Sequence, residues 1–153
     1  METTCTKLPY LVLMQTSKAV QDRMRVEMSQ YNLSITEFSV LEVLYNKGKQ
    51  TIHQIGNSIL ISSGTMTYVI DKLEQRDLLC RHGCVEDRRV IHVNLTEEGK
   101  EMMGNIMPKH HEFVESMFEY LNKEEEEIFV KLLKKLSGKV QSYFFWFYIS
   151  IPR

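Results

Sequence analysis

The stretch Ser62–Thr96, SSGTMTYVIDKLEQRDLLCRHGCVEDRRVIHVNLT, decides the fold. Its first half has apolar residues at helical spacing, and its second half has two short runs rich in Leu, Val and Ile around a polar loop. The loop ends in the cluster Asp87-Arg88-Arg89, and Thr96 can then cap another helix. A short amphipathic helix followed at once by an arginine-tipped hairpin is typical of a winged helix-turn-helix, which binds duplex DNA.

The helix predicted from Ser62 to Gln75 has two different faces. Met66, Val69, Ile70 and Leu73 form a stripe that fits a core. The opposite face is mostly small and hydrogen-bonding, as a helix that enters a DNA groove requires, although a solvated helix face is the alternative. We expect DNA contacts from this face and from the wing, at Ser62, Ser63, Gly64, Thr65, Thr67, Tyr68, Lys72, Arg81, Arg88 and Arg89.

Helices surround this stretch on both sides. A long helix is predicted from Lys7 to Tyr31, and a second begins at the capping box Ser34-Ile35-Thr36-Glu37 and stops at Gly48. A third short helix follows Thr51, a further helix runs from Thr96 to about residue 120, and the last begins at Asn122. The predicted fold class is therefore mostly α with a small β-hairpin, a winged helix-turn-helix between N- and C-terminal helices that form a dimerisation lobe. The predicted domains are 1–32, 33–96 and 97–153.

The segment YFFWFYISI from Tyr143 is apolar on every side. A helix that is apolar all round must be buried all round, and a chain of 153 residues has little interior left to cover it. Burial in a homodimer, with the first and last helices of two chains interleaved, is the simplest explanation. A tail that touches a membrane is the alternative.

Composition sets further limits. The hydrophobic content of 43% supports a real core, and no apolar run has the roughly 18 to 20 residues of a membrane span. The first residues lack the pattern of a signal peptide, so we expect a soluble cytoplasmic protein without a membrane partner. The net charge of −1 counts against nucleic acid, since many DNA-binding proteins are basic. A winged helix that binds protein and not DNA is therefore the main alternative.

Three segments resemble the MarR family of bacterial transcriptional regulators. They are LSITEFSVLEVL from Leu33, IGNSILISSGTMTYVIDKLEQRDLL from Ile55, and EDRRVIHVNLTEEG from Glu86. The most specific part is the wing pair Asp87 and Arg89. Within the family the likeness is strongest to the quinone-responsive, MhqR-type branch.

The resemblance implies an obligate homodimer that binds a palindromic operator on double-stranded DNA, usually as a repressor. The recognition helix would be 62–75 and the wing 81–89, and small phenolic or quinone-like effectors would release the DNA. Two-fold symmetry agrees with a palindrome, since two recognition helices would lie about 34 Å apart. Arg88 and Arg89 suit a narrow minor groove, and Asp87 would stabilise the wing by pinning an arginine. The residues of an effector pocket are not predicted.

The three cysteines do not form a disulfide framework, because their number is odd. Some relatives sense peroxides through a cysteine at a position that falls near Val12 here, so Cys5 does not match it. Cys80 and Cys84 lie on the predicted wing, where nearby Arg and His side chains favour thiolates that oxidants or electrophilic quinones modify. Tolerated thiols without such a role are the alternative.

Neither a metal nor a cofactor is predicted. Cys80, His82 and Cys84 offer three metal ligands, but we reason that a strand points alternate side chains to opposite faces, and no fourth ligand is apparent. The sequence has no nucleotide-binding loop, no Gly-x-Ser-x-Gly and no specific pair of carboxylates. We therefore expect no enzyme, with a small thiol oxidoreductase acting through Cys80 or Cys84 as a remote alternative.

Overall fold

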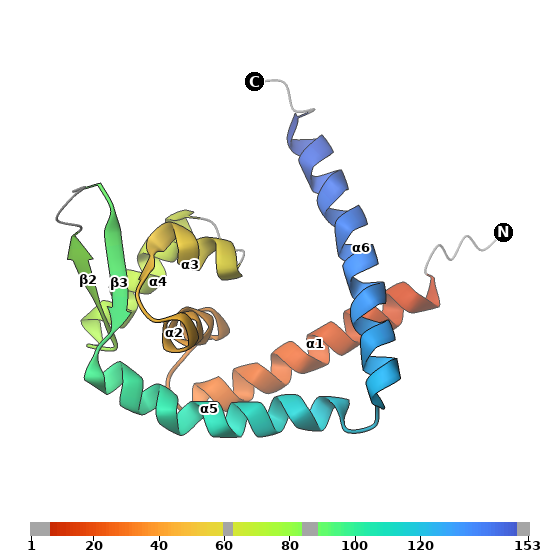
Figure 1. Ribbon diagram of the computed structural model, residues 1–153, viewed down its shortest axis with the longest axis horizontal. Coiled ribbons are helices and arrows are strands. Elements are labelled where there is room, and N and C mark those ends of the chain that lie inside the picture. The colour runs from red at the N-terminus through yellow and green to blue at the C-terminus, as the bar shows by residue number, and fades with distance from the viewer. Residues whose placement is uncertain (1–6, 60–62, 84–88, 150–153) are drawn as a thin grey trace. The chain divides into compact units, whose positions relative to one another are not determined.

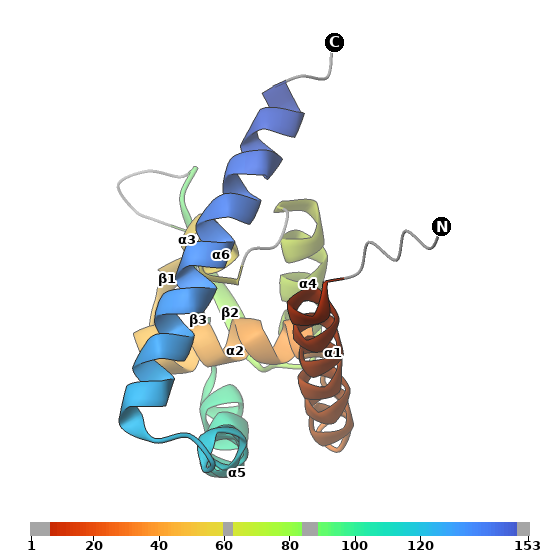
Figure 2. The same cartoon turned by 90° about the vertical axis from the view of Figure 1, so that its right-hand side faces the viewer.

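The computed structural model describes residues 7–59, 63–83 and 89–149, and at 63–64 and 139–149 only the backbone is described. The chain divides into two compact units, residues 1–105 and 106–153. The elements are α1 (Leu8–Ser29), α2 (Ile35–Lys47), β1 (Gln50–Thr51), α3 (Ile52–Ile59), α4 (Ser63–Gln75), β2 (Leu79–Gly83), β3 (Ile91–Leu95), α5 (Glu97–Phe118) and α6 (Lys123–Ile149). Strand β1 is labelled in Figure 2 and the other elements in Figure 1. The predicted fold class, mostly helical with a small antiparallel sheet, is confirmed.

Reciprocal side-chain caps begin two helices of the first unit. At α2 the Ser34 hydroxyl accepts from the Glu37 amide at 3.2 Å, and the Glu37 carboxylate accepts from the Ser34 amide at 2.6 Å, so the predicted capping box is confirmed. At α3 the Thr51 hydroxyl accepts from the Gln54 amide at 3.1 Å, and Gln54 accepts from the Thr51 amide at 2.8 Å. These bonds satisfy amides that a helix leaves unpaired at its first turn.

The later helices begin as their sequences predict. The Thr96 hydroxyl accepts from the Gly99 amide at 3.0 Å at the start of α5. At α6 the Asn122 side chain accepts from the Glu125 amide at 3.0 Å, and Glu125 accepts from the Asn122 amide at 2.9 Å. Local sequence is sufficient to place these boundaries because each cap joins residues three apart.

Residues with positive φ follow three helices of the first unit, α1, α2 and α4. Asn32, at φ 54°, closes α1, and the amide of Leu33 reaches back to the Met28 carbonyl at 3.1 Å. Asp77, at φ 56°, follows α4 in the same way. Gly48 ends α2 at φ 70° and ψ −147°, a combination that glycine adopts without strain.

The sheet is antiparallel and has the order β1-β3-β2. The predicted hairpin is β2 with β3, in a register that places Arg81 opposite Val93. A third strand was not predicted: Thr51, expected only as a helix cap, also pairs with His92 as part of β1. Two residues are too short to show strand alternation, so this pairing depends on a partner 41 positions away in the chain.

The core of the first unit gathers around α2. This helix packs against α1, α3, α4 and β3, and Figures 1 and 2 both show it below α3 and α4. The predicted inward stripe of α4, Met66, Val69, Ile70 and Leu73, is buried. The other buried apolar residues of this unit are Met28, Leu33, Phe38, Val40, Leu41, Leu44, Ile55, Leu78, Leu79, Val93, Leu95 and Met103.

Two terminal helices keep apolar side chains on their surfaces. On α1 of the first unit, the run from Tyr10 to Met14 is exposed at every position. On α6 of the second unit, the predicted stripe is exposed at Ile128, Leu132 and Leu136. The backbone of α6 continues to Ile149, and the side chains of the aromatic tail lie outside the described residues.

Candidate nucleic-acid interface

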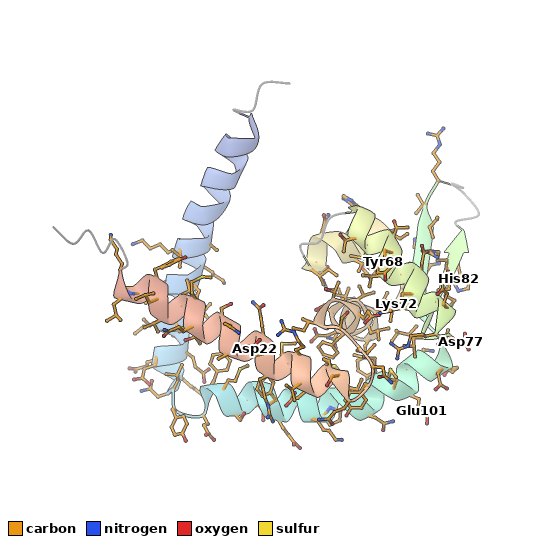
Figure 3. All side chains as sticks on the ribbon, turned by 180° about the vertical axis from the view of Figure 1, so that it is seen from behind. Asp22, Tyr68, Lys72, Asp77, His82 and Glu101 are labelled. Carbon is orange, nitrogen blue, oxygen red and sulfur yellow. The ribbon has the colours of Figure 1, made fainter. Side chains whose placement is uncertain are left out.

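Helix α4 presents a polar face opposite its buried stripe. Thr65, Thr67, Tyr68 and Lys72 are all exposed, Tyr68 to 68%. Tyr68 and Lys72 follow one another along the helix in Figure 3. Four of the predicted contact residues thus share one accessible surface. Ser63 and Gly64 lie in the first turn of α4 without described side chains, and Ser62 lies outside the described residues.

Arg81 on β2 ties the wing to α4. Its guanidinium pairs with the carboxylates of Asp71 and Glu74, and its amide donates to Glu74 at 3.2 Å. Burial disfavours the charged form of Arg81, but the hydrogen bonds and attraction of the two carboxylates outweigh it and raise its pKa. The structure gives Arg81 a positioning role that the sequence did not predict, and its direct contact with DNA stays a prediction.

Lys72 is held from the opposite side of α4. Its ammonium lies 3.0 Å from Oε1 of Glu37, the buried residue that also completes the α2 capping box. The Lys72 side chain is still 49% exposed. Three ion pairs, two with Arg81 of β2 and one with Glu37 of α2, therefore hold α4 in this unit.

Arg76 connects the end of α4 to the end of α1. Its guanidinium donates to the carbonyl of Asn32 at 2.6 Å and to the carbonyl of Tyr31 at 3.1 Å. Both carbonyls belong to the turn that follows α1, outside the hydrogen bonds of the helix itself, so a side-chain donor can satisfy them. The sequence showed Arg76 only as one more charge, since a contact between residues 44 apart leaves no local signal.

The structure describes the base of the wing and not residues 84–88 at its tip. Arg89 is exposed in the turn that leads into β3. The predicted contact Arg88, the predicted stabilising residue Asp87 and the thiol of Cys84 lie outside the described residues. The roles predicted for the wing tip therefore stay predictions.

An open pocket of about 540 Å³ lies between α3 and the base of the wing. His53 and Asn57 of α3, which contact each other at 3.1 Å, supply its polar groups together with Arg89. The sequence did not predict this pocket. Its remaining lining residues are Thr51, Ile52, Gly56, Met66, Val90 and Ile91.

Cys80 is partly exposed on β2 and lies next to a histidine. Its sulfur is 3.2 Å from Nε2 of His82 and 3.9 Å from the carbonyl of Asn94. Strand alternation does not separate Cys80 from His82, contrary to the prediction, because residues two apart on a strand share a face. Within the described part of the chain, no three His, Cys, Asp or Glu side chains form a group suited to a metal ion.

Among the described helices, none combines the length and the apolar character that crossing a bilayer requires.

A buried three-helix core, an exposed face on its last helix and an attached two-stranded wing define a winged helix-turn-helix protein. The MarR family profile matches residues 33–91. The chain is 40% identical to the HTH-type transcriptional regulator MhqR of Bacillus subtilis, over 83% of this chain and 88% of that protein. The chain belongs to the MarR family of transcriptional regulators. The likeness to MhqR predicted from the sequence is confirmed.

Solved structures support the same fold. AbsC, a MarR family regulator of Streptomyces coelicolor, has a TM-score of 0.83 at 19% identity and covers 93% of this chain and 98% of its own. BpsR of Bordetella bronchiseptica, whose DNA binding is regulated by 6-hydroxynicotinic acid, has a TM-score of 0.76 at 25% identity. That match covers 90% of this chain and 97% of BpsR.

Proposed function

We propose that the chain is a homodimeric, sequence-specific DNA-binding repressor that phenolic or quinone-like compounds, or thiol modification, release from its operator. The observation that carries the proposal is the exposed face of α4, whose orientation is fixed by Arg81 on one side and Glu37 on the other. A helix that reads base edges must keep its side chains in register with a groove, so a rigid mounting favours sequence readout.

A homodimer accounts for the apolar surfaces. Tyr10–Met14 on α1 and Ile128, Leu132 and Leu136 on α6 are exposed in a single copy. Contiguous exposed apolar side chains mark association surfaces in proteins that do not enter membranes. A two-fold dimer repeats the recognition helix, so the operator is expected to be a palindrome with half-sites about 34 Å apart.

Two observations support a small aromatic effector. The sequence resemblance to the MhqR-type branch implies a quinone-like compound, and the DNA binding of BpsR, a protein of similar structure, is regulated by 6-hydroxynicotinic acid. An effector acts by binding better to a dimer whose recognition helices have the wrong spacing, so that the DNA-competent state loses population. Cys80 supplies a second route, because its thiol is accessible and lies against His82.

Mobility shifts on DNA upstream of the chain's own reading frame, with a salt titration, test the DNA-binding function. We expect specific binding whose affinity falls steeply with salt, because basic side chains displace counterions from phosphates. A winged helix that binds only protein, which the net charge of −1 favours, would show no such binding. That result would remove the proposed function.

The release mechanism is tested on the formed complex. Phenols and quinones are screened for release of the DNA, with a variant in which Cys80 and Cys84 are both serine as the comparison. If this variant releases DNA as the wild type does, thiol modification is refuted as the release mechanism and a non-covalent effector is supported. Catalytic turnover of quinone by the wild type would instead favour the oxidoreductase alternative.

A further inference from the structure

Glu37 is a buried acid that serves two elements at once. Its side chain is only 3% exposed, yet its carboxylate faces a backbone amide on one side and an ammonium on the other. Oε2 accepts from the Ser34 amide at 2.6 Å, and Oε1 lies 3.0 Å from Nζ of Lys72. A capping box needs only the first contact, and Gln supplies that contact as well as Glu does. Gln has a single acceptor oxygen, so with that oxygen on the Ser34 amide it would turn its NH2 group toward Lys72; the ion pair therefore requires the carboxylate of Glu37.

The charge state of Glu37 is maintained against its burial. Burial by itself raises the pKa of a carboxyl group, but the amide and hydroxyl of Ser34 and the ammonium of Lys72 stabilise the anion. Together they hold the pKa of Glu37 below its ordinary value. The residue is thus an anion at neutral pH and attracts Lys72.

Lys72 is tethered but remains accessible. It stands on the same exposed face of α4 as Thr65 and Tyr68, and its side chain is about half exposed. A lysine without such a partner is a flexible chain that ends in a point charge, and it loses rotamer freedom when it makes a directed contact. A lysine whose ammonium is already held in place loses less rotamer freedom when it makes such a contact.

We propose that Glu37 is a positioning residue for DNA recognition, which acts by fixing the Lys72 ammonium on the reading face of α4. This inference rests on the proposed DNA-binding function. With Glu37 present, Lys72 makes one directed contact in the operator, and the Glu37 carboxylate offsets part of its charge within the protein. Without Glu37, the same ammonium becomes a mobile cation that binds phosphate on any sequence.

The two states of Lys72 predict opposite effects on two kinds of DNA. Glu37→Gln should weaken operator binding by about tenfold, which lies at the low end of what one directed contact contributes. Binding to random-sequence DNA should stay equal or become stronger, and its salt dependence should steepen by about one phosphate contact. A general loss of folding would lower both affinities together.

Three variants separate positioning from stability. Glu37→Gln keeps the capping box and removes the ion pair, whereas Ser34→Ala removes the hydroxyl cap and leaves the carboxylate beside Lys72. Lys72→Met removes the cation and keeps most of the side-chain volume. Affinity for the operator and for random-sequence DNA is measured at several salt concentrations, alongside the Tm of each variant.

We expect the ratio of specific to non-specific affinity to fall in Glu37→Gln and in Lys72→Met, and to stay at the wild-type value in Ser34→Ala. We also expect Glu37→Gln to have no further effect on this ratio once Lys72 is Met. The inference is overturned if Glu37→Gln keeps the wild-type ratio, or if it lowers the ratio equally in the Lys72→Met background. Absence of operator binding by the wild type would instead refute the proposed function.

Discussion

The apolar stripes of α4 and α6 have similar spacing in the sequence, but the first is buried and the second is exposed. On α4, Met66 and Ile70 are fully buried within one unit of a single chain. On α6, Ile128, Leu132 and Leu136 have the same helical spacing and are 55%, 59% and 44% exposed. Within the described residues, the core of the winged helix-turn-helix is thus buried in a single copy, whereas the stripe of α6 is exposed, as the proposed dimer would require.

The largest effect should come from a charged residue in the exposed stripe of α6, which is part of the proposed dimer surface. Leu132→Glu places a charge on the exposed stripe, where a single chain tolerates it but a dimer interface would bury it without a partner. Two-fold symmetry repeats the cost in both subunits. Light scattering should show a monomer, and operator affinity should fall by at least about 100-fold because one recognition helix is lost.

Lys131→Glu is the matched control, since it introduces the same residue one position earlier, at another exposed site on α6. It should remain a dimer. If both variants stay dimeric and bind the operator normally, the exposed stripe of α6 is not the dimer surface.

The next effect tests the completeness of the first unit. A Cβ at Gly99 would lie 2.0 Å from the carbonyl oxygen of Leu78, which is backbone and cannot rotate away. Gly99→Ala should therefore lower the free energy of unfolding by about 3 kcal/mol, as overpacking does. Gly104→Ala on the same helix meets nothing within 4 Å and should stabilise the protein by about 0.5–1 kcal/mol. Urea unfolding measures both, and equal effects would contradict the close approach.

A smaller effect should follow from loosening the wing. Arg81→Ala removes the cation between Asp71 and Glu74 and leaves two like charges near each other. These carboxylates are partly exposed, so solvent screening limits the expected loss of stability to about 1 kcal/mol. Arg81→Lys should restore only part of it, because one ammonium cannot reproduce the forked contact. Full stability of Arg81→Ala in urea unfolding would show that the ion pairs do not secure the wing.

The smallest effect is expected on the free energy of unfolding at acidic pH. The pKa of Glu37 is lowered on folding, so its stabilisation is fully present above its ordinary value of 4.5 and is lost as the pH falls through the lower, folded value. Unfolding free energy measured from pH 7 to pH 3 should fall less steeply below about pH 4.5 in Glu37→Gln than in the wild type. Parallel curves would show that Glu37 does not titrate as an ion-paired group.

Features that depend on residues close together in the chain could be predicted from the sequence. The starts of α2, α5 and α6 follow from caps that join residues three apart, and the stripe of α4 follows from helical spacing. The polar face of α4 was correctly placed outward for the same reason.

Contacts between distant residues could not be predicted in this way. Strand β1 exists only because Gln50 and Thr51 pair with β3, and Arg76 binds the turn after a helix that ended more than 40 residues earlier. The pairing of Arg81 with Asp71 and Glu74 was not predicted, and its contact with DNA stays a prediction. Charge alone does not reveal whether an arginine faces a ligand or a carboxylate of its own chain.

Selection of bound fragments from a random pool of double-stranded DNA, with the purified full-length protein, tests the central claim most directly. The account predicts enrichment of an inverted repeat whose half-site centres lie about one helical turn apart, bound by two copies of the chain. Enrichment of an unpaired half-site bound by a single copy, or no enrichment at all, would contradict it.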